Sequence, residues 1–166
     1  MPCFKTDFRN TRRTAFHLVV LPRTHASFLL VTLLAAGLLS GPDAPAHAAG
    51  SYGIKAVAVA ASKQGSPYAY GATGPNRFDC SGLTLYAFRK AGRRLPRTAD
   101  QQYEHIRHIR QADRAPGDLV FFPRGATMAH VGIYAGHDRI WHAPRPGTRV
   151  RLERIWSAAV RYGRAT

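Results

Sequence analysis

The spacing of apolar residues changes once along this chain, from a helical repeat to the short apolar runs that are typical of strands. Before residue 105, apolar positions recur every three or four residues, which predicts one helix over 54–61 and a second over 80–91. After residue 105, the apolar runs are short and are separated by short turns. Helices followed by closely connected strands predict an α+β fold with helices packed on an antiparallel sheet, and they argue against repeated βαβ units.

The ends of two helices can be placed from capping residues. Asp79 is a predicted N-cap of the second helix, because its carboxylate can accept a hydrogen bond from a free N–H of the first turn. Gly92 suits the C-terminal end of the same helix. Thr98 and Gln101 have the spacing of a capping box, which predicts a short third helix over 99–105.

Six segments of the second half are expected to be strands. Residues 49–53 are expected to be a polar lead-in, and 123–128 a loop between two of the strands. Val150 and Leu152 alternate with charged residues and are expected to point inward. The expected strands are 106–109, 119–122, 130–134, 139–143, 149–154 and a last one that includes Val160 and Tyr162.

The first 48 residues have the layout of a secretory signal. A basic leader precedes an apolar run over 26–39, and Ala46-His47-Ala48 fits the small-x-small pattern of a cleavage site. The run is shorter than the roughly 20 residues that span a bilayer, which argues against the alternative of an uncleaved membrane anchor. We therefore predict a signal peptide over 1–48 and a mature domain over 49–166 that is secreted, wall-associated or periplasmic, with no membrane anchor after cleavage.

The chain is strongly basic, with 24 Lys and Arg against 9 Asp and Glu and a formal net charge of +15. Such a charge favours an anionic partner. An exported protein meets anionic wall polymers before it meets nucleic acid, so we expect wall polymers and no nucleic acid as partners. A solvated arginine-rich surface without a specific partner is the alternative.

Cys80 is the one cysteine outside the predicted signal, which contains Cys3. An unpaired cysteine in an exported protein is a liability unless it is buried or used. A buried small apolar side chain is the ordinary explanation. However, Asp79 places Cys80 at the first position of a helix, where the helix dipole favours a thiolate and is expected to lower the thiol pKa. Cys80 is therefore a candidate nucleophile.

A thiol nucleophile needs a base and a third group that orients the base. His130 and His142 fall on neighbouring expected strands, so both imidazoles can lie on one face of the sheet. If that face meets the start of the second helix, the three residues form a line of nucleophile, base and orienting group. His105 and His108 are spaced like a metal pair, but no further cysteine or carboxylate cluster completes four ligands, so we predict neither a metal nor a cofactor.

Six blocks of the chain together resemble the NlpC-type family of bacterial cell-wall cysteine peptidases. They occur in the family's order and cover essentially the whole predicted mature domain. The blocks are GSPYAYG (65–71), FDCSGL (78–83), LPRT (95–98), PGDLVFF (116–122), HVGIY (130–134) and HAP (142–144).

The resemblance implies a papain-like α+β fold and, as activity, hydrolysis of an amide bond in the stem peptide of peptidoglycan. The usual target in that family is the bond between γ-D-glutamate and a diamino acid, cleaved through a cysteine thioester. We expect a monomer whose substrate is peptidoglycan. The implied site comprises the nucleophile Cys80, the base His130 and the orienting His142, with Tyr68, Asp79 and Ser81 in or near the substrate cleft.

Other functions remain open on the sequence alone. An amidase acting at the sugar–peptide junction or an acyltransferase could use the same residues. A wall-binding domain could keep the fold without catalysis, although all three residues of the constellation are present. A secreted toxin would share the chemistry and differ in attacking a competitor's wall.

Overall fold

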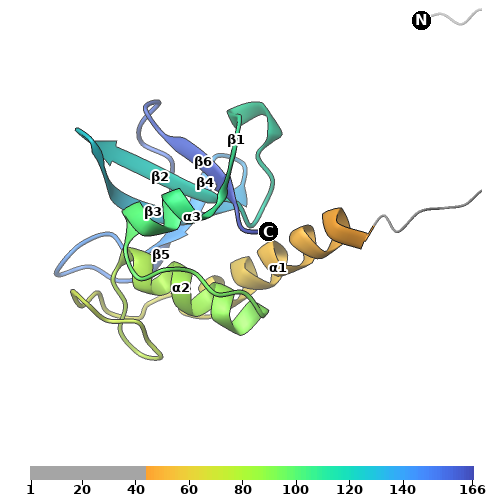
Figure 1. Cartoon of the computed structure of the whole chain (residues 1–166). Helices are drawn as coiled ribbons and strands as arrows, with labels where there is room; N and C mark the ends of the chain where they lie inside the picture. Colours follow the sequence, from red (N-terminus) through yellow and green to blue (C-terminus); the bar gives the residue numbers. More distant parts are fainter. Residues whose placement is uncertain (1–43) are drawn as a thin grey trace, which may run out of the picture. The chain divides into compact units, whose positions relative to one another are not determined.

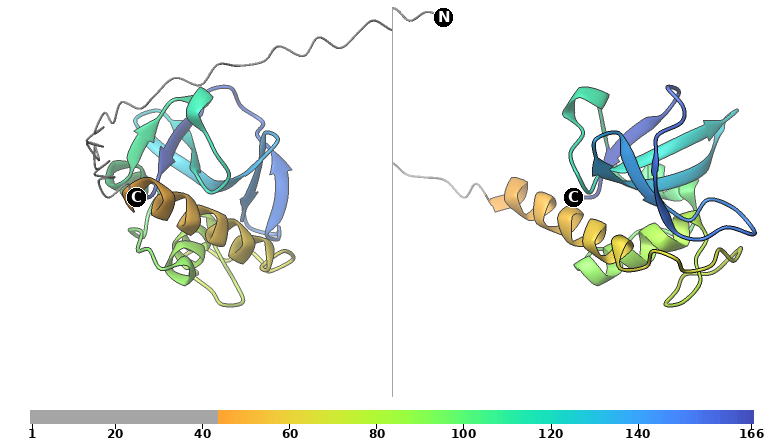
Figure 2. Two further views of the ribbon diagram at one scale, coloured as in Figure 1. Left: turned by 90° about the vertical axis from the view of Figure 1, so that its right-hand side faces the viewer. Right: turned by 180° about the vertical axis from the view of Figure 1, so that it is seen from behind.

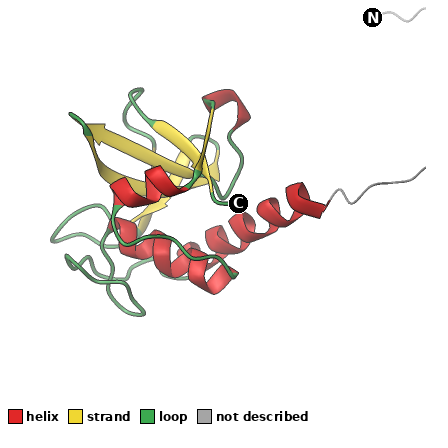
Figure 3. Cartoon of the chain, viewed as in Figure 1, coloured by secondary structure: helices red, strands yellow, loops and turns green. Residues whose placement is uncertain are grey.

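The computed structural model describes residues 44–166, which form helices followed by an antiparallel sheet (Figures 1 and 3). The predicted signal peptide lies outside the described residues, except for 44–48, which belong to the first helix. The elements are α1 (Ala44–Ala61), α2 (Cys80–Ala91), α3 (Ala99–His105), β1 (Arg107–Ile109), the 3-10 turn η1 (Gln111–Asp113), β2 (Leu119–Arg124), β3 (Thr127–Gly136), β4 (Arg139–His142), β5 (Arg151–Arg154) and β6 (Arg161–Arg164).

The six strands form one sheet in the order β1-β6-β2-β3-β4-β5, and each neighbouring pair is antiparallel. β2, β3, β4 and β5 lie side by side in chain order, whereas β6 returns to pair between β1 and β2. β5 is therefore an edge strand. The α+β prediction is confirmed.

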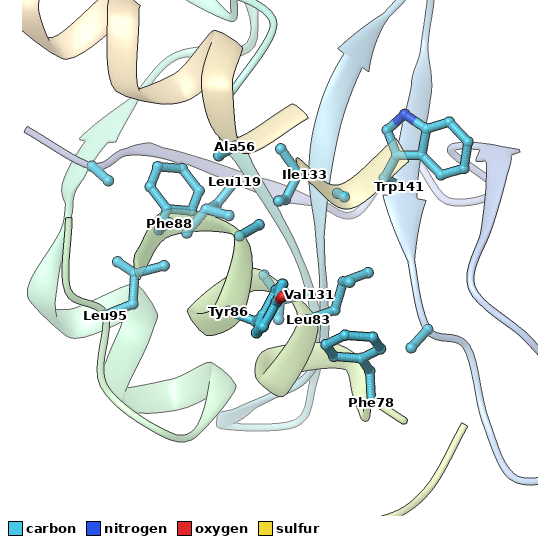
Figure 4. Packing of buried hydrophobic residues seen from close by; sticks show 14 of the residues in the cluster. Ala56, Phe78, Leu83, Tyr86, Phe88, Leu95, Leu119, Val131, Ile133 and Trp141 are labelled. Carbon is cyan, nitrogen blue, oxygen red and sulfur yellow. The ribbon is translucent and has the colours of Figure 1, made fainter. Parts of the chain in front are cut away.

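The helices α1 and α2 pack against each other on one side of the sheet (Figures 1 and 2). Alternation along β2 sends Leu119 and Phe121 toward this side and Val120 and Phe122 to the other face. Figure 4 shows the main core, which lies between the helices and the sheet. Its apolar side chains keep water out of the space between these two layers. Fully buried members of this core include Ala56, Phe78, Leu83, Phe88, Leu119, Val131 and Ile133.

α2 begins and ends where its capping residues predict. The carboxylate of Asp79 accepts a hydrogen bond from the Gly82 N–H at 2.7 Å, and Gly92 ends the helix with φ of 98°. Thr98 and Gln101 form the predicted capping box of α3. These local predictions are confirmed because each depends on side chains within one turn of the helix end.

Several expectations about local structure are wrong. The polar lead-in at 49–53 is part of α1, which starts at Ala44. The expected loop at 123–128 is mostly strand, because a tight turn at Gly125, with φ of 61°, lets β2 and β3 pair almost to their ends. Leu152 is 37% exposed because it lies on the edge strand β5, whereas Val150, just before that strand, is buried as expected. None of the helices within residues 44–166 has the length and apolar character needed to cross a bilayer.

Candidate active site

Cys80 is a free, half-buried thiol at the first position of α2, where it packs against the main core. Backbone hydrogen bonds from Ser81, from Val131 of β3 and from Cys80 itself reach its sulfur. The Val131 backbone thus places the thiol against β3, the strand in which His130 is the preceding residue. The fold therefore joins the start of α2 to the strand that carries the candidate base.

The pKa of Cys80 is raised, which contradicts the direction expected from the helix dipole. Burial of the thiol is the largest cause, and the negative charge of the adjacent Asp79 adds to it. The backbone hydrogen bonds to the sulfur lower the pKa but do not offset these two effects. Cys80 therefore rests as a thiol at neutral pH and needs a base for activation.

His130 and His142 face each other across β3 and β4, as the strand pattern predicts. His130 Nε2 lies 2.9 Å from His142 Nδ1, and the two rings meet edge to face with centroids 5.1 Å apart. His142 is 1% exposed, whereas His130 is half-buried. The buried ring therefore holds the more accessible ring by one hydrogen bond.

Both imidazoles are neutral at neutral pH. Burial and, to a smaller extent, the neighbouring His142 lower the pKa of His130 to about 3, while the charge of Glu153 acts in the opposite direction. Burial also lowers the pKa of His142, whereas the hydrogen bond that His142 donates to Glu153 acts in the opposite direction. A neutral His130 has a nitrogen lone pair and can accept a proton from a thiol.

Glu153 of β5 extends the line of side chains beyond His142, and the sequence reasoning missed it. Its Oε2 lies 2.9 Å from His142 Nε2 and accepts a hydrogen bond from Arg151 Nε at 2.7 Å. The hydrogen bond from Arg151 is the main reason that the pKa of Glu153 is lowered, so the carboxyl group is ionised. One signal was available in the sequence, because Glu153 is the lone acidic residue in an otherwise basic strand.

Asp79 and Ser81 belong to a hydrogen-bonded cluster that fixes the loop before α2. The carboxylate of Asp79 accepts hydrogen bonds from the N–H groups of Gly71 and Gly82, at 2.9 and 2.7 Å, and pairs with Arg97. Arg97 also donates to Ser81 Oγ at 3.0 Å. The two predicted cleft residues are buried, and these contacts hold the segment that carries Cys80. Arg97 is thus part of this cluster, although no sequence pattern assigned it to the site.

Gly82 lets the same loop approach the helix closely. A Cβ at this position would lie 2.1 Å from the carbonyl oxygen of Ala72, which accepts a hydrogen bond from the Asp79 N–H at 3.0 Å. Only a glycine leaves room for this contact without moving backbone. The glycine that follows Cys80 and Ser81 is therefore needed to dock the loop on the first turn of α2.

Tyr68 lies close enough to the thiol for the charge of Cys80 to affect it. The pKa of its hydroxyl is raised by burial and then by the charges of Cys80 and Asp79, while Arg97 acts in the opposite direction. Its chain segment forms an isolated bridge to Phe78, just before the helix. Cys80, Tyr68, Asp79 and Ser81 are thus brought together at one end of α2.

A hollow of about 620 Å³ adjoins the two imidazoles. Trp156 is 55% exposed and stacks on Phe122, with centroids 4.1 Å apart and rings 10° from parallel. The hollow combines aromatic faces with guanidinium groups, which suits a ligand that carries carboxylates. Its lining residues are Phe122, Pro123, Arg124, Ala129, His130, His142, Pro144, Arg145, Arg151, Glu153 and Trp156.

Of the two histidines with metal-like spacing, His105 and His108, the second interacts with Tyr103. His108 stacks on Tyr103 with centroids 4.0 Å apart, and its Nε2 lies 2.8 Å from the Tyr103 carbonyl oxygen. Within residues 44–166, no group of three or more His, Cys, Asp or Glu side chains is arranged to hold a metal ion.

Curated relatives of the chain are named as endopeptidases. A protein named "Probable endopeptidase Cgl2188" from Corynebacterium glutamicum is 45% identical over 113 residues, which cover 68% of this chain and 53% of the relative. The bifunctional muramidase/DL-endopeptidase CwlT of Bacillus subtilis is 43% identical over 88 residues, covering 51% of this chain and 27% of CwlT. The chain thus spans about half, or less, of the length of these relatives.

Solved structures share the fold. The NlpC/p60 domain of the peptidoglycan hydrolase SagA is similar with a TM-score of 0.62 and 30% identity, over 69% of this chain and 98% of that one. The peptidoglycan hydrolase RipB of Mycobacterium tuberculosis has a TM-score of 0.63 and 28% identity, over 72% of this chain and 67% of that one. The helices and antiparallel sheet therefore match the papain-like architecture of these structures. Residues 65–162 match the profile described as the NlpC/P60 family, and the chain belongs to that family.

Proposed function

We propose that the domain over 49–166 hydrolyses an amide bond in the peptidoglycan stem peptide through a thioester on Cys80. Membership of the NlpC/P60 family and the names of its relatives support this activity. The observation that carries the proposal is the hydrogen bond between His130 and His142, at 2.9 Å. His130 belongs to β3, and the backbone of β3 also contacts the thiol. A base held in this way beside a lone thiol has the arrangement of nucleophilic catalysis.

The first half of the reaction forms the thioester. His130 accepts the thiol proton, and the sulfur of Cys80 attacks the amide carbonyl carbon. Among residues 44–166, the Cys80 N–H donates to no backbone carbonyl and lies at the start of α2, so we propose that it binds the developing oxyanion. One such donor contributes roughly 3 kcal/mol to transition-state stabilisation.

The second half releases the products. The imidazolium of His130 gives its proton to the leaving amine as the carbon–nitrogen bond breaks. Neutral His130 then accepts a proton from water, which attacks the thioester and frees the carboxylate and the thiol. His142 keeps the ring of His130 in one orientation through both steps.

We propose that the bond cleaved is the one between γ-D-glutamate and the diamino acid. The name of the relative CwlT includes a DL-endopeptidase activity, which is consistent with this choice. A γ-linked D-glutamate keeps its α-carboxylate next to that bond, and the hollow beside His130 is lined by Arg124 and Arg145, which are exposed. Guanidinium groups bind carboxylates with two parallel hydrogen bonds, which favours a substrate of this charge.

The place of action follows from the predicted signal over 1–48. We propose that the domain is exported and acts on the wall as a monomer, and that its basic surface is attracted to anionic wall polymers. Residues 49–166 keep 19 of the 24 Lys and Arg and 7 of the 9 Asp and Glu, a formal charge of +12 that supports this attraction, and the attraction should weaken as salt is added.

Digestion of purified peptidoglycan by the chain from Ala49 tests the proposed function, with products identified by mass and Cys80→Ala as the control. We expect fragments that end at the second residue of the stem, and none with the variant. Free stem peptides with bare glycan would instead indicate an amidase. Binding without cleavage would indicate a wall-binding domain, and fragments joined to an added amine would indicate an acyltransferase.

A further inference from the structure

We propose that Glu153 is a positioning residue that fixes the tautomers of His142 and His130 in series and so leaves His130 Nδ1 free to accept the Cys80 proton. The inference deepens the proposed function and rests on it. It starts from one unbroken line of contacts, from Arg151 through Glu153 and His142 to His130.

The carboxylate sets the proton on the first ring. Glu153 is held ionised by Arg151, and an ionised carboxylate can only accept hydrogen bonds. At 2.9 Å from Glu153 Oε2, His142 Nε2 must therefore be the nitrogen that carries the proton. His142 is buried and neutral, so it has only that one ring proton, and its Nδ1 is an acceptor.

The first ring then sets the proton on the second. His130 Nε2 lies 2.9 Å from the accepting His142 Nδ1, so His130 Nε2 must donate. Neutral His130 then has no proton on Nδ1. Among residues 44–166 no hydrogen bond reaches His130 Nδ1, and the neighbouring Val131 contacts the Cys80 sulfur through its backbone. The free lone pair therefore belongs to the residue next to the thiol.

Without Glu153 the order of protons can reverse. His142 could then carry its proton on Nδ1 and donate to His130 Nε2, which would place the proton of His130 on Nδ1. In that tautomer the nitrogen left for Cys80 has no lone pair to accept a proton. Glu153, two hydrogen bonds away from His130, thus selects the tautomer of His130 that can accept the thiol proton.

This arrangement prepares the attack of Cys80 on the amide, in which each proton has a defined donor and acceptor. The proton of the Cys80 S–H moves to His130 Nδ1, the electron pair of that bond becomes the new bond from sulfur to the carbonyl carbon, and the π electron pair of the carbonyl moves to its oxygen. His130 then carries a positive charge and keeps its Nε2–H bonded to His142. The negative charge of Glu153 stabilises this imidazolium through the intervening ring.

The tautomers can be read directly from the imidazole nitrogen and proton NMR signals of full chains labelled with 15N-histidine. For the wild type we expect a proton on Nε2 and none on Nδ1 in both His130 and His142. Glu153→Ala and Glu153→Gln should give mixed or reversed tautomers, because an amide can also donate to His142 Nε2. Glu104→Gln removes the same charge from an exposed position on α3 and should leave both rings unchanged.

Kinetics on a muropeptide gives the second readout. Glu153→Gln should lower kcat by about 10- to 100-fold, as loss of a carboxylate behind a functional histidine does elsewhere, with KM changed less than about twofold. Wild-type tautomers in both Glu153 variants, or unchanged kcat in Glu153→Gln, would overturn the proposal. If Glu153→Ala fails to fold, the nearly isosteric Glu153→Gln decides the question. The NMR result needs no turnover, so it stands apart from any failure of the proposed hydrolysis.

Discussion

His130 Nε2 and His142 Nδ1 lie 2.9 Å apart on adjacent strands, and the second of these rings is almost wholly buried. The exposed side of this pair faces the hollow, and the buried side is held by Glu153. The two histidines are therefore not equivalent. We therefore predict that His130 exchanges protons with the thiol and the substrate, and that His142 only holds its neighbour.

This asymmetry predicts different losses of turnover in alanine variants. His130→Ala should lower kcat by about a thousand-fold, because general base and acid catalysis is lost. His142→Ala should lower it by about 10- to 100-fold, because the base is still present but neither its orientation nor its tautomer is fixed. The measurement is kcat on a muropeptide, with folding checked by circular dichroism. His108→Ala, which changes a histidine stacked on Tyr103 instead, should leave kcat unchanged. Equal losses in the first two variants would contradict the separate roles.

The pH dependence of kcat/KM should show a base with a strongly lowered pKa. Burial and His142 lower the pKa of His130 to about 3, and the base must be neutral to accept a proton. Activity should therefore be lost only as pH falls through the lowered value, so the acid limb should lie below about pH 5 and not near the 6.5 of a free imidazole. Circular dichroism at each pH separates titration from unfolding. An acid limb near 6.5 in folded protein would rule out a buried neutral base.

Alkylation of Cys80 by iodoacetamide should require alkaline pH in the His130→Ala variant. Burial and the charge of Asp79 raise the thiol pKa, and only the thiolate reacts. The rate for the chain from Ala49, which has no other cysteine, should rise with a midpoint above the roughly 8.5 of a free cysteine. Glutathione under the same conditions is the reference. Full reactivity at pH 7 would mean that the helix dipole dominates after all.

Asp79→Ala should destabilise the fold more than an ordinary surface change. It removes the N-cap of α2, the acceptor for Gly71 and the buried partner of Arg97. Loss of a cap and of a buried acceptor together predicts a fall of about 2 kcal/mol in the free energy of unfolding, measured by urea titration. Asp113→Ala breaks an exposed pair with Arg110 and should change stability little. Similar effects of both variants would argue against a structural role for the Asp79 cluster.

The parts of this structure that could be predicted from sequence depend on neighbours along the chain. The ends of α2 follow from Asp79 and Gly92, and α3 follows from a capping box. The shared face of His130 and His142 follows from the two-residue period of strands. Each of these needs only local geometry and one pairing of adjacent strands.

The remaining features depend on tertiary packing. The contact of Glu153 with His142 requires the register of β4 on β5, which pairs His142 with Arg151. The raised pKa of Cys80 requires the burial that the core imposes, which outweighs the local helix dipole. The exposure of Leu152 requires knowledge that β5 is an edge strand. An alternating pattern determines which residues of a strand share a face of the sheet. It does not determine which strand lies next to it or whether it lies at the edge.

Trapping of the covalent intermediate tests the central claim most directly. The chain from Ala49 is mixed with a muropeptide, quenched in acid during turnover, digested with trypsin and analysed by mass spectrometry. We predict that the peptide containing Cys80 gains the mass of the acyl half of the substrate as a thioester, and that hydroxylamine removes this mass. Turnover without any adduct on Cys80, together with hydrolysis that persists in Cys80→Ala, would contradict the account.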